Sequence, residues 1–254
     1  MPAILVTNDD GVNAPGIQAL AGAMATLGDV SVIAPATNQS ASGHKKTLFS
    51  DITFHQATLQ DGVTPATAIT GSPADCIALA ALGAARWPVR AVVSGINRGS
   101  NMGQDVTYSG TVTAALEAAI NGVPAVAFSL DDHYADDVAD YQAAALVAVR
   151  VMRIVLEKAH TLPPFTILNV NIPRGDTVKG IRLTRQGIRV YRDELEQDGA
   201  VYRIVGEPPT GILDEPGTDL WAVENGYASV TPLHLDLTAH HFMADLAAWD
   251  LTLD

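Results

Sequence analysis

Short apolar runs alternate with longer amphipathic stretches through the first two thirds of the chain. Apolar runs that end in polar turns predict buried parallel strands at residues 3–7, 30–34, 91–94, 124–129 and 165–171. Apolar positions at helical spacing predict helices at residues 16–27, 72–85, 111–121 and 137–158. This alternation is typical of an α/β fold with a doubly wound, mostly parallel sheet, a Rossmann-like arrangement of three layers.

The pattern changes after Pro173. Short segments, several of which alternate like strands, predict a β-rich extension with hairpins at residues 180–185, 188–192, 201–205, 219–223 and 228–233. The tail from His240 carries Phe242, Leu246 and Trp249 at helical spacing, which predicts a C-terminal helix. We therefore expect two parts of one functional unit. A Rossmann-like catalytic core with a metal site covers residues 1–173, and an extension that contributes to oligomerisation covers residues 174–254.

The composition limits the partners of this chain. Its 254 residues, 48% of them hydrophobic, suit one large folded domain and argue against disorder. A formal net charge of −13 disfavours binding to DNA or RNA, whereas a small anionic substrate could bind beside a metal ion. No apolar run is long enough to span a bilayer, and no basic leader precedes the first strand, so we expect a cytoplasmic protein without membrane contact. The single cysteine, Cys76, lies in an apolar run and is expected to be buried.

The first candidate site residues follow the first predicted strand. Asn8-Asp9-Asp10-Gly11 comes where open α/β sheets bind ligands, beyond the carboxyl end of a strand. Two carboxylates that meet where the chain turns at Gly11 would neutralise a divalent cation such as Mg²⁺ or Mn²⁺, which prefer oxygen ligands. The alternative is an ordinary polar turn in which these side chains bind only backbone groups.

Two further loops leave the carboxyl ends of predicted strands. The loop over residues 35–46 offers the Ser40 hydroxyl as a ligand, although segments rich in Ser and Gly are usually plain loops. The connection over residues 94–111 contains Asn97 and ends in Ser109-Gly110-Thr111, where a helix begins with free N–H groups that can bind an anion. Capping of that helix by Ser109 or Thr111 is the simpler explanation, and the same geometry would serve both purposes.

These motifs, in this order, resemble those of the SurE family (survival protein E, stationary-phase nucleotidases). The resemblance is carried by Val6-Thr7-Asn8-Asp9-Asp10-Gly11, Asn38-Gln39-Ser40, Gly71-Ser72-Pro73-Ala74-Asp75-Cys76, Ser94-Gly95-Ile96-Asn97-Arg98-Gly99-Ser100-Asn101, Tyr108-Ser109-Gly110-Thr111-Val112 and Gly226-Tyr227-Ala228-Ser229-Val230-Thr231-Pro232-Leu233. It implies one divalent metal ion per subunit, held by Asp9, Asp10, Ser40 and Asn97. It also implies hydrolysis of nucleoside 5′- and 3′-monophosphates, and assembly into homodimers or homotetramers through the C-terminal region.

The hypothesis that follows is metal-assisted hydrolysis of a phosphate monoester. A bound cation would polarise a phosphate oxygen and lower the pKa of a water that attacks phosphorus. Asn8 and Asp9 are the expected catalytic residues, Asp9 as a metal ligand and Asn8 as a group that holds the phosphate. The phosphate oxygens would also be held by Ser109, Gly110 and Thr111. A covalent aspartyl-phosphate is disfavoured, because the two aspartates are adjacent and do not form an Asp-x-Asp motif. Two alternatives share the fold: a nucleotide-binding module without turnover, and a metal-dependent hydrolase of another bond.

Overall fold

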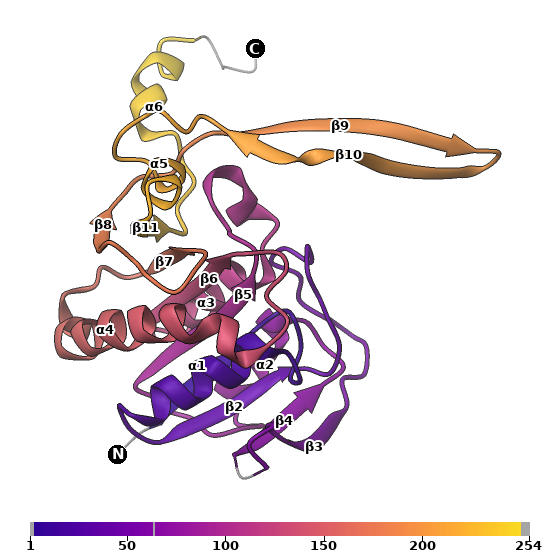
Figure 1. Ribbon diagram of the computed structural model, residues 1–254, viewed down its shortest axis with the longest axis vertical. Coiled ribbons are helices and arrows are strands. Elements are labelled where there is room, and N and C mark those ends of the chain that lie inside the picture. The colour runs from indigo at the N-terminus through magenta and orange to yellow at the C-terminus, as the bar shows by residue number, and fades with distance from the viewer. Residues whose placement is uncertain (1–2, 63, 250–254) are drawn as a thin grey trace.

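Most strands of the chain form a single mixed sheet in the computed structural model, which describes residues 3–62 and 64–249 (Figure 1). Within these residues the strands of the sheet follow the order β3-β4-β2-β1-β5-β6-β7-β11-β8. Their bounds are β1 Ile4–Thr7, β2 Val30–Pro35, β3 Phe54–Thr58, β4 Pro65–Ile69, β5 Ala91–Arg98, β6 Ala125–Asp131, β7 Thr166–Pro173, β8 Ile181–Leu183 and β11 Ala228–His234. The strands from β4 to β7 are parallel, whereas β3 is antiparallel to β4 and β11 is antiparallel to β7. The predicted α/β fold is confirmed.

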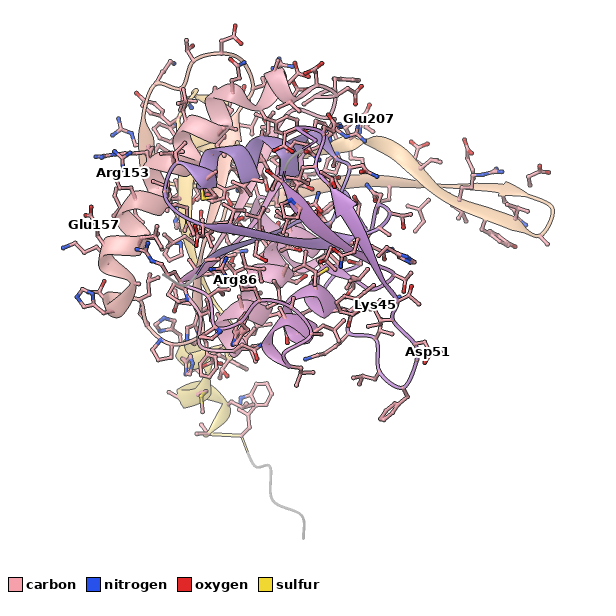
Figure 2. The ribbon with its side chains drawn as sticks, turned by 90° about the horizontal axis from the view of Figure 1, so that it is seen from below. Lys45, Asp51, Arg86, Arg153, Glu157 and Glu207 are labelled. Atoms are coloured by element: carbon pink, nitrogen blue, oxygen red, sulfur yellow. The ribbon has the colours of Figure 1, made fainter. Side chains whose placement is uncertain are left out.

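Helices cover both faces of this sheet. The α-helices are α1 Pro15–Ala25, α2 Pro73–Ala81, α3 Gly110–Ile120, α4 Gln142–Lys158, α5 Asp219–Glu224 and α6 His240–Leu246, and the 3₁₀ turns are η1 Gly103–Thr107, η2 Val138–Tyr141 and η3 Ala159–Thr161. Helices α1 and α4 share a buried apolar cluster with Val6, whereas α2 and α3 share one with Leu5. Because neighbouring strand residues point to opposite faces, these clusters are the two inner layers of a three-layer sandwich. The outer side of α4 carries exposed Arg153 and Glu157 (Figure 2).

The predicted elements of the first 173 residues match the structure closely, with three differences. Strand β5 continues past the predicted end at Ser94 to Arg98, so Asn97 lies on the strand itself. The helix predicted over residues 137–158 begins as the 3₁₀ turn η2 before α4 starts. Strands β3 and β4 were not predicted. Strand β3 is almost entirely exposed and carries no apolar run.

The C-terminal segment contributes to the main sheet as well as extending from it. Strands β8 and β11 continue the sheet beyond β7, so the predicted boundary after Pro173 does not coincide with a break in the sheet. The strand predicted over residues 219–223 is wrong, because this segment forms the helix α5. Thr218 caps that helix by accepting a hydrogen bond from the Trp221 N–H. Leu220 and Val223, from the apolar run of α5, pack together with Met102.

A long antiparallel hairpin extends away from the body of the molecule (Figure 1). It is formed by β9 (Arg189–Asp198) and β10 (Val201–Gly211), and Figure 2 shows Glu207 on the part of β10 nearest to the body. The predicted C-terminal helix is present as α6. It ends at Leu246, and Trp249 lies beyond it with its ring edge against Phe242. No helix in the described ranges is long and apolar enough to cross a membrane.

Candidate active site at the carboxyl edge of the sheet

Three candidate loops meet because their strands are neighbours. Strands β2, β1 and β5 lie side by side and run parallel, with Thr7 paired to Ser94. Their carboxyl ends therefore lie at one edge of the sheet, and the chain segments that follow them face the same space. The loops predicted to carry Asp9, Ser40 and Asn97 are brought together in this way, and all three residues line one pocket.

Asp9 is a buried carboxylate at this edge, with only 3% of its surface exposed. Its Oδ1 accepts a hydrogen bond from the Thr111 hydroxyl, and its Oδ2 accepts one from the Thr111 N–H at 3.1 Å. Burial raises the pKa of Asp9 above its ordinary value, although the hydrogen bonds from Thr111 and Gly110 act in the opposite direction. A positive charge bound beside this group would stabilise its ionised form.

Asp10 adds a second carboxylate directly beside the first. Its Oδ2 accepts a hydrogen bond from the Arg98 N–H at 3.0 Å, and its Oδ1 lies 3.4 Å from the Asn38 amide nitrogen. Burial, together with the negative charge of Asp9, raises the pKa of Asp10 to about 6. Two adjacent, largely buried carboxylates repel each other when both are ionised, and a divalent cation would relieve that repulsion.

The loop of residues 36–47, called the serine loop below, is fixed against Asp9 by its backbone. The Gln39 N–H donates to the Asp9 carbonyl oxygen at 2.7 Å. Next along the chain, the Ser40 N–H donates to the side-chain oxygen of Asn38 at 2.8 Å. These bonds hold Ser40 in the lining of the same pocket as Asp9.

Two acidic side chains, one on α3 and one on α2, anchor residues 44–47 of the serine loop. Glu117 on α3 accepts from Lys46 at 2.8 Å and contacts His44 at 3.1 Å. Burial opposes ionisation of Glu117, but these two partners outweigh it and hold the pKa of Glu117 below its ordinary value. Asp75 on α2 accepts from the N–H and the hydroxyl of Thr47 at 2.8 and 2.7 Å. The loop is therefore tied to both helices on this face of the sheet.

Asn97 offers an amide oxygen to the same space. Its Nδ2 donates to the Gly99 carbonyl oxygen at 2.7 Å, and within the described part of the chain its Oδ1 accepts no hydrogen bond. Asp9, Ser40 and Asn97 line the pocket, and Asp10, which is not part of that lining, follows Asp9 directly in the chain. Together the four would supply two carboxylates, a hydroxyl and an amide oxygen, a set of oxygen donors that suits Mg²⁺ or Mn²⁺. The described residues contain no group of three or more His, Cys, Asp and Glu side chains that could hold a metal ion. A metal site at this edge therefore needs the neutral oxygens as well as the carboxylates.

The start of α3 holds the carboxylate of Asp9. Both donors of Thr111 are used by Asp9, and a Cβ on Gly110 would lie 2.8 Å from the Asp9 Cβ. Gly110 and Thr111 therefore hold Asp9 in place, and the phosphate contact predicted for them stays a prediction. Ser109 caps the helix by accepting from the Val112 N–H, and it also lines the pocket, so its contact with phosphate stays a prediction.

Asn8 shapes the turn that presents the two aspartates. It is fully buried, its Nδ2 donates to the Gly11 carbonyl oxygen at 2.9 Å, and its Oδ1 accepts from the Gly11 N–H at 3.2 Å. Gly11 has a φ of +103°, a backbone conformation that favours glycine. These contacts give Asn8 a structural role in the turn, and the phosphate contact that the sequence suggested for it stays a prediction.

Comparison with known proteins assigns the family. The model of the family described as survival protein SurE matches residues 4–193. The chain belongs to the SurE family. A protein named 5′-nucleotidase SurE from Chloroflexus aggregans is 43% identical to this SurE-family chain, over 97% of the chain and 98% of that protein. One named 5′-nucleotidase SurE 1 from Thermus thermophilus is 46% identical over 96% of each. The crystal structure of the SurE protein from Aquifex aeolicus superposes with a TM-score of 0.80 at 39% identity, covering 96% of this chain and 98% of that one.

The pocket of this SurE-family protein extends well beyond Asp9. It encloses about 630 Å³ and continues across the ends of β5, β6 and β7 toward the base of the hairpin. Sequence reasoning missed most of its lining, which includes Met102, Asp131, His133, Tyr134, Arg174, Arg189, Pro208, Pro209, Leu213, Leu220 and Val223. These residues come from separate segments with no shared motif, so only the three-dimensional arrangement brings them together.

Proposed function

We propose that this chain is a divalent-metal-dependent phosphatase that hydrolyses nucleoside 5′-monophosphates, and also 3′-monophosphates, to a nucleoside and phosphate. The observation that carries the proposal is the pair of adjacent, mostly buried carboxylates, Asp9 and Asp10, of which Asp9 lines one pocket with the neutral oxygen donors Ser40 and Asn97. The names of the relatives, 5′-nucleotidase SurE, support the same reaction class.

The four oxygen donors would hold one Mg²⁺ or Mn²⁺ ion per subunit. When bound, such an ion supplies a Lewis acid that polarises a phosphate oxygen. Without the ion, the two carboxylates give this edge two negative charges, which would repel a phosphate dianion. The charge of the bound ion would balance them, so that the dianion could approach. This requirement explains why an acidic chain can bind an anionic substrate.

The residues around the ligands preorganise this edge before substrate binds. Thr111 orients the Asp9 carboxylate with two hydrogen bonds, and the Arg98 N–H orients that of Asp10. Ser109 lines the pocket at the start of α3, where its side chain can contact a phosphate oxygen. Fixed donors of this kind stabilise charge that develops in the transition state without reorganising during the reaction.

Phosphate release from a panel of mononucleotides tests the proposal. We expect release from 5′-AMP and 3′-AMP in the presence of Mg²⁺ or Mn²⁺, and loss of release after treatment with EDTA. Asp9→Asn and Asp10→Asn should each reduce turnover by more than the roughly 10- to 100-fold that loss of an outer-shell partner of a metal typically costs. Asp29→Asn is the matched control, because Asp29 is exposed and precedes β2 at the opposite edge of the sheet.

Two results would contradict the proposal. Nucleotide binding that is insensitive to chelator and yields no phosphate would identify a binding module without turnover. Full activity of Asp9→Asn or Asp10→Asn at limiting Mn²⁺ would remove that aspartate from the metal site.

A further inference from the structure

The motif at residues 71–76 supplies no ligand to the proposed metal site, yet two of its side chains bond the serine loop. The Ser72 hydroxyl donates to the Lys45 carbonyl oxygen at 2.6 Å. Asp75, which is only 2% exposed, accepts from the N–H and the hydroxyl of Thr47, and also from the Ser72 N–H at 2.8 Å. The start of α2 thus holds the serine loop at residues 45 and 47.

Glu117 on α3 holds the same loop from the neighbouring helix. Its side chain is only 4% exposed, its charge is paired with Lys46 at 2.8 Å, and it contacts His44 at 3.1 Å. A buried carboxylate that loses its counter-charge is strongly destabilising. Because both of these partners belong to the serine loop, movement of the loop away from α3 would leave Glu117 buried without a counter-charge. The observed position of the loop is favoured for that reason.

The exposed apex of the serine loop carries the predicted metal ligand. Ser40 and Ala41 are exposed and line the pocket, and Ala41 has a φ of +57°, a left-handed conformation that residues other than glycine keep only where their surroundings enforce it. Before the apex, the Gln39 N–H is bonded to the Asp9 carbonyl oxygen. After it, Gly43 is bonded at both its N–H and its carbonyl oxygen. The shape of the apex therefore depends on what holds the loop on each side of it.

We propose that Asp75 and Glu117 are positioning residues that hold the serine loop in place and keep Ser40 at the metal edge before an ion binds. This inference rests on the proposed function, because Ser40 matters only if that edge binds a metal ion. The described lining of the pocket includes neither of these two acids, nor their partners Lys46 and Thr47, so they act through the loop. A loop that is already in place loses less conformational freedom on binding than one that must first be ordered.

The sign of the effect separates positioning from simple electrostatics. Loss of a positive side chain makes the chain more negative, and Coulomb attraction alone would then bind a cation more tightly. Lys46→Met removes the ion pair with Glu117 and keeps the apolar stem, and positioning predicts weaker Mn²⁺ binding. We expect a loss of about tenfold, at the low end of the range for outer-shell partners because the loop backbone lies between Lys46 and the ligand. Lys46→Arg keeps the charge and is the matched control, with Mn²⁺ affinity close to that of the wild type.

Thr47→Val tests the second anchor without a change of charge. The variant removes the hydroxyl that donates to Asp75 and retains the N–H that donates to the same carboxylate. We expect a smaller loss of Mn²⁺ affinity than in Lys46→Met, because one of the two bonds remains. Thr47→Ser keeps the hydroxyl and is the matched control.

A variant that lacks the ligand shows whether the anchors act through it. In a Ser40→Ala background the anchors have no hydroxyl to position, so Lys46→Met should cause little further loss of Mn²⁺ affinity. An equal loss in both backgrounds would overturn the inference, because Lys46 would then act on the site by another route. Hydrogen exchange gives a readout without metal: the Gly43 N–H, bonded to the Tyr108 carbonyl oxygen, should exchange faster in Lys46→Met than in the wild type. Unchanged exchange would contradict a loosened loop.

Calorimetric titration of Mn²⁺, with phosphate release from 5′-AMP measured on the same samples, separates this inference from the proposed function. Melting temperatures establish that each variant is folded. Weaker Mn²⁺ binding in Lys46→Met and Thr47→Val, with no phosphate release by the wild type, would support positioning and overturn the proposed function. Wild-type or tighter Mn²⁺ binding in Lys46→Met would remove the role of Glu117, and wild-type binding in Thr47→Val would remove that of Asp75. A wild-type chain that binds no Mn²⁺ would overturn both proposals.

Discussion

Replacing Thr111 by valine would separate two roles that the same side chain could play. The hydroxyl of Thr111 donates to Asp9 and, in this structure, is directed at that carboxylate and not at the pocket. Thr111→Val removes this donor, keeps the shape, and retains the N–H that binds Oδ2 at 3.1 Å. If Thr111 acts through Asp9, the main effect of the variant should be a loss of metal affinity. Any loss of phosphate binding should follow from the weaker metal binding.

The expected loss can be estimated from that one contact. A hydrogen bond to a charged group contributes about 1.5–3 kcal/mol, and about 1.4 kcal/mol corresponds to a tenfold change in an equilibrium constant. Asp9 is buried, so water cannot replace the hydroxyl freely. We therefore expect Mn²⁺ affinity to fall by about 10- to 100-fold, in line with the loss of outer-shell partners at other metal sites.

Calorimetric titration of Mn²⁺ into the metal-free protein measures this directly. Thr184→Val is the matched control: Thr184 is also buried, but its hydroxyl bonds that of Thr231 and touches no carboxylate. The control should lower the melting temperature while keeping Mn²⁺ affinity. Wild-type Mn²⁺ affinity in Thr111→Val, or an equal loss in both variants, would refute the role of Thr111 as the group that holds Asp9.

Three further results are expected. Asp10→Asn should raise the melting temperature of the metal-free protein at neutral pH, because a carboxyl whose pKa is raised to about 6 by burial and a neighbouring charge destabilises the fold once it is ionised; an unchanged or lower melting temperature would contradict this. Glu117 has a lowered pKa, held down against burial by His44 and Lys46, so its contribution to stability is present above the unfolded value of about 4.5 and is lost as the pH falls below it. The difference in melting temperature between wild type and Glu117→Gln should accordingly shrink in acid, and a difference that is constant with pH would count against the ion pairs. Sedimentation should show a dimer or tetramer at micromolar concentration, and deletion of residues 240–254 should lower the assembly state or cause aggregation; a full-length monomer would defeat that expectation.

The arrangement of the metal edge could be predicted from the sequence because it depends on topology alone. The apolar runs of β1, β2 and β5 indicate parallel strands, and parallel neighbours end at the same edge of a sheet. Asp9, Ser40 and Asn97 each follow or end such a strand, so their proximity follows without knowledge of any side-chain contact. The same reasoning could not show that Thr111 faces Asp9, since that contact joins residues 102 positions apart.

The part of the pocket lined by the C-terminal segment, from Arg189 to Glu224, could not be predicted from the sequence. The apolar run Leu220–Val223 fits a strand as well as a helix, and the cap from Thr218 that decides for a helix depends on its local geometry. The contacts of Asp219 with Gly103 and Gly187, and of Arg189 with Asp105, connect segments whose sequences carry no common pattern. Tertiary packing, which periodicity does not report, therefore determines where the C-terminal segment meets the metal edge.

The central claim is that a divalent ion held at the edge formed by Asp9, Asp10, Ser40 and Asn97 is required for hydrolysis of nucleoside monophosphates. The most direct test follows Mn²⁺ binding and phosphate release from 5′-AMP on the same samples as Mn²⁺ is titrated into the EDTA-treated protein. We predict one ion per chain, activity that rises in proportion to occupancy, and neither binding nor release in Asp10→Asn. Phosphate release at full rate before any Mn²⁺ is bound, or Mn²⁺ binding without release, would contradict the account.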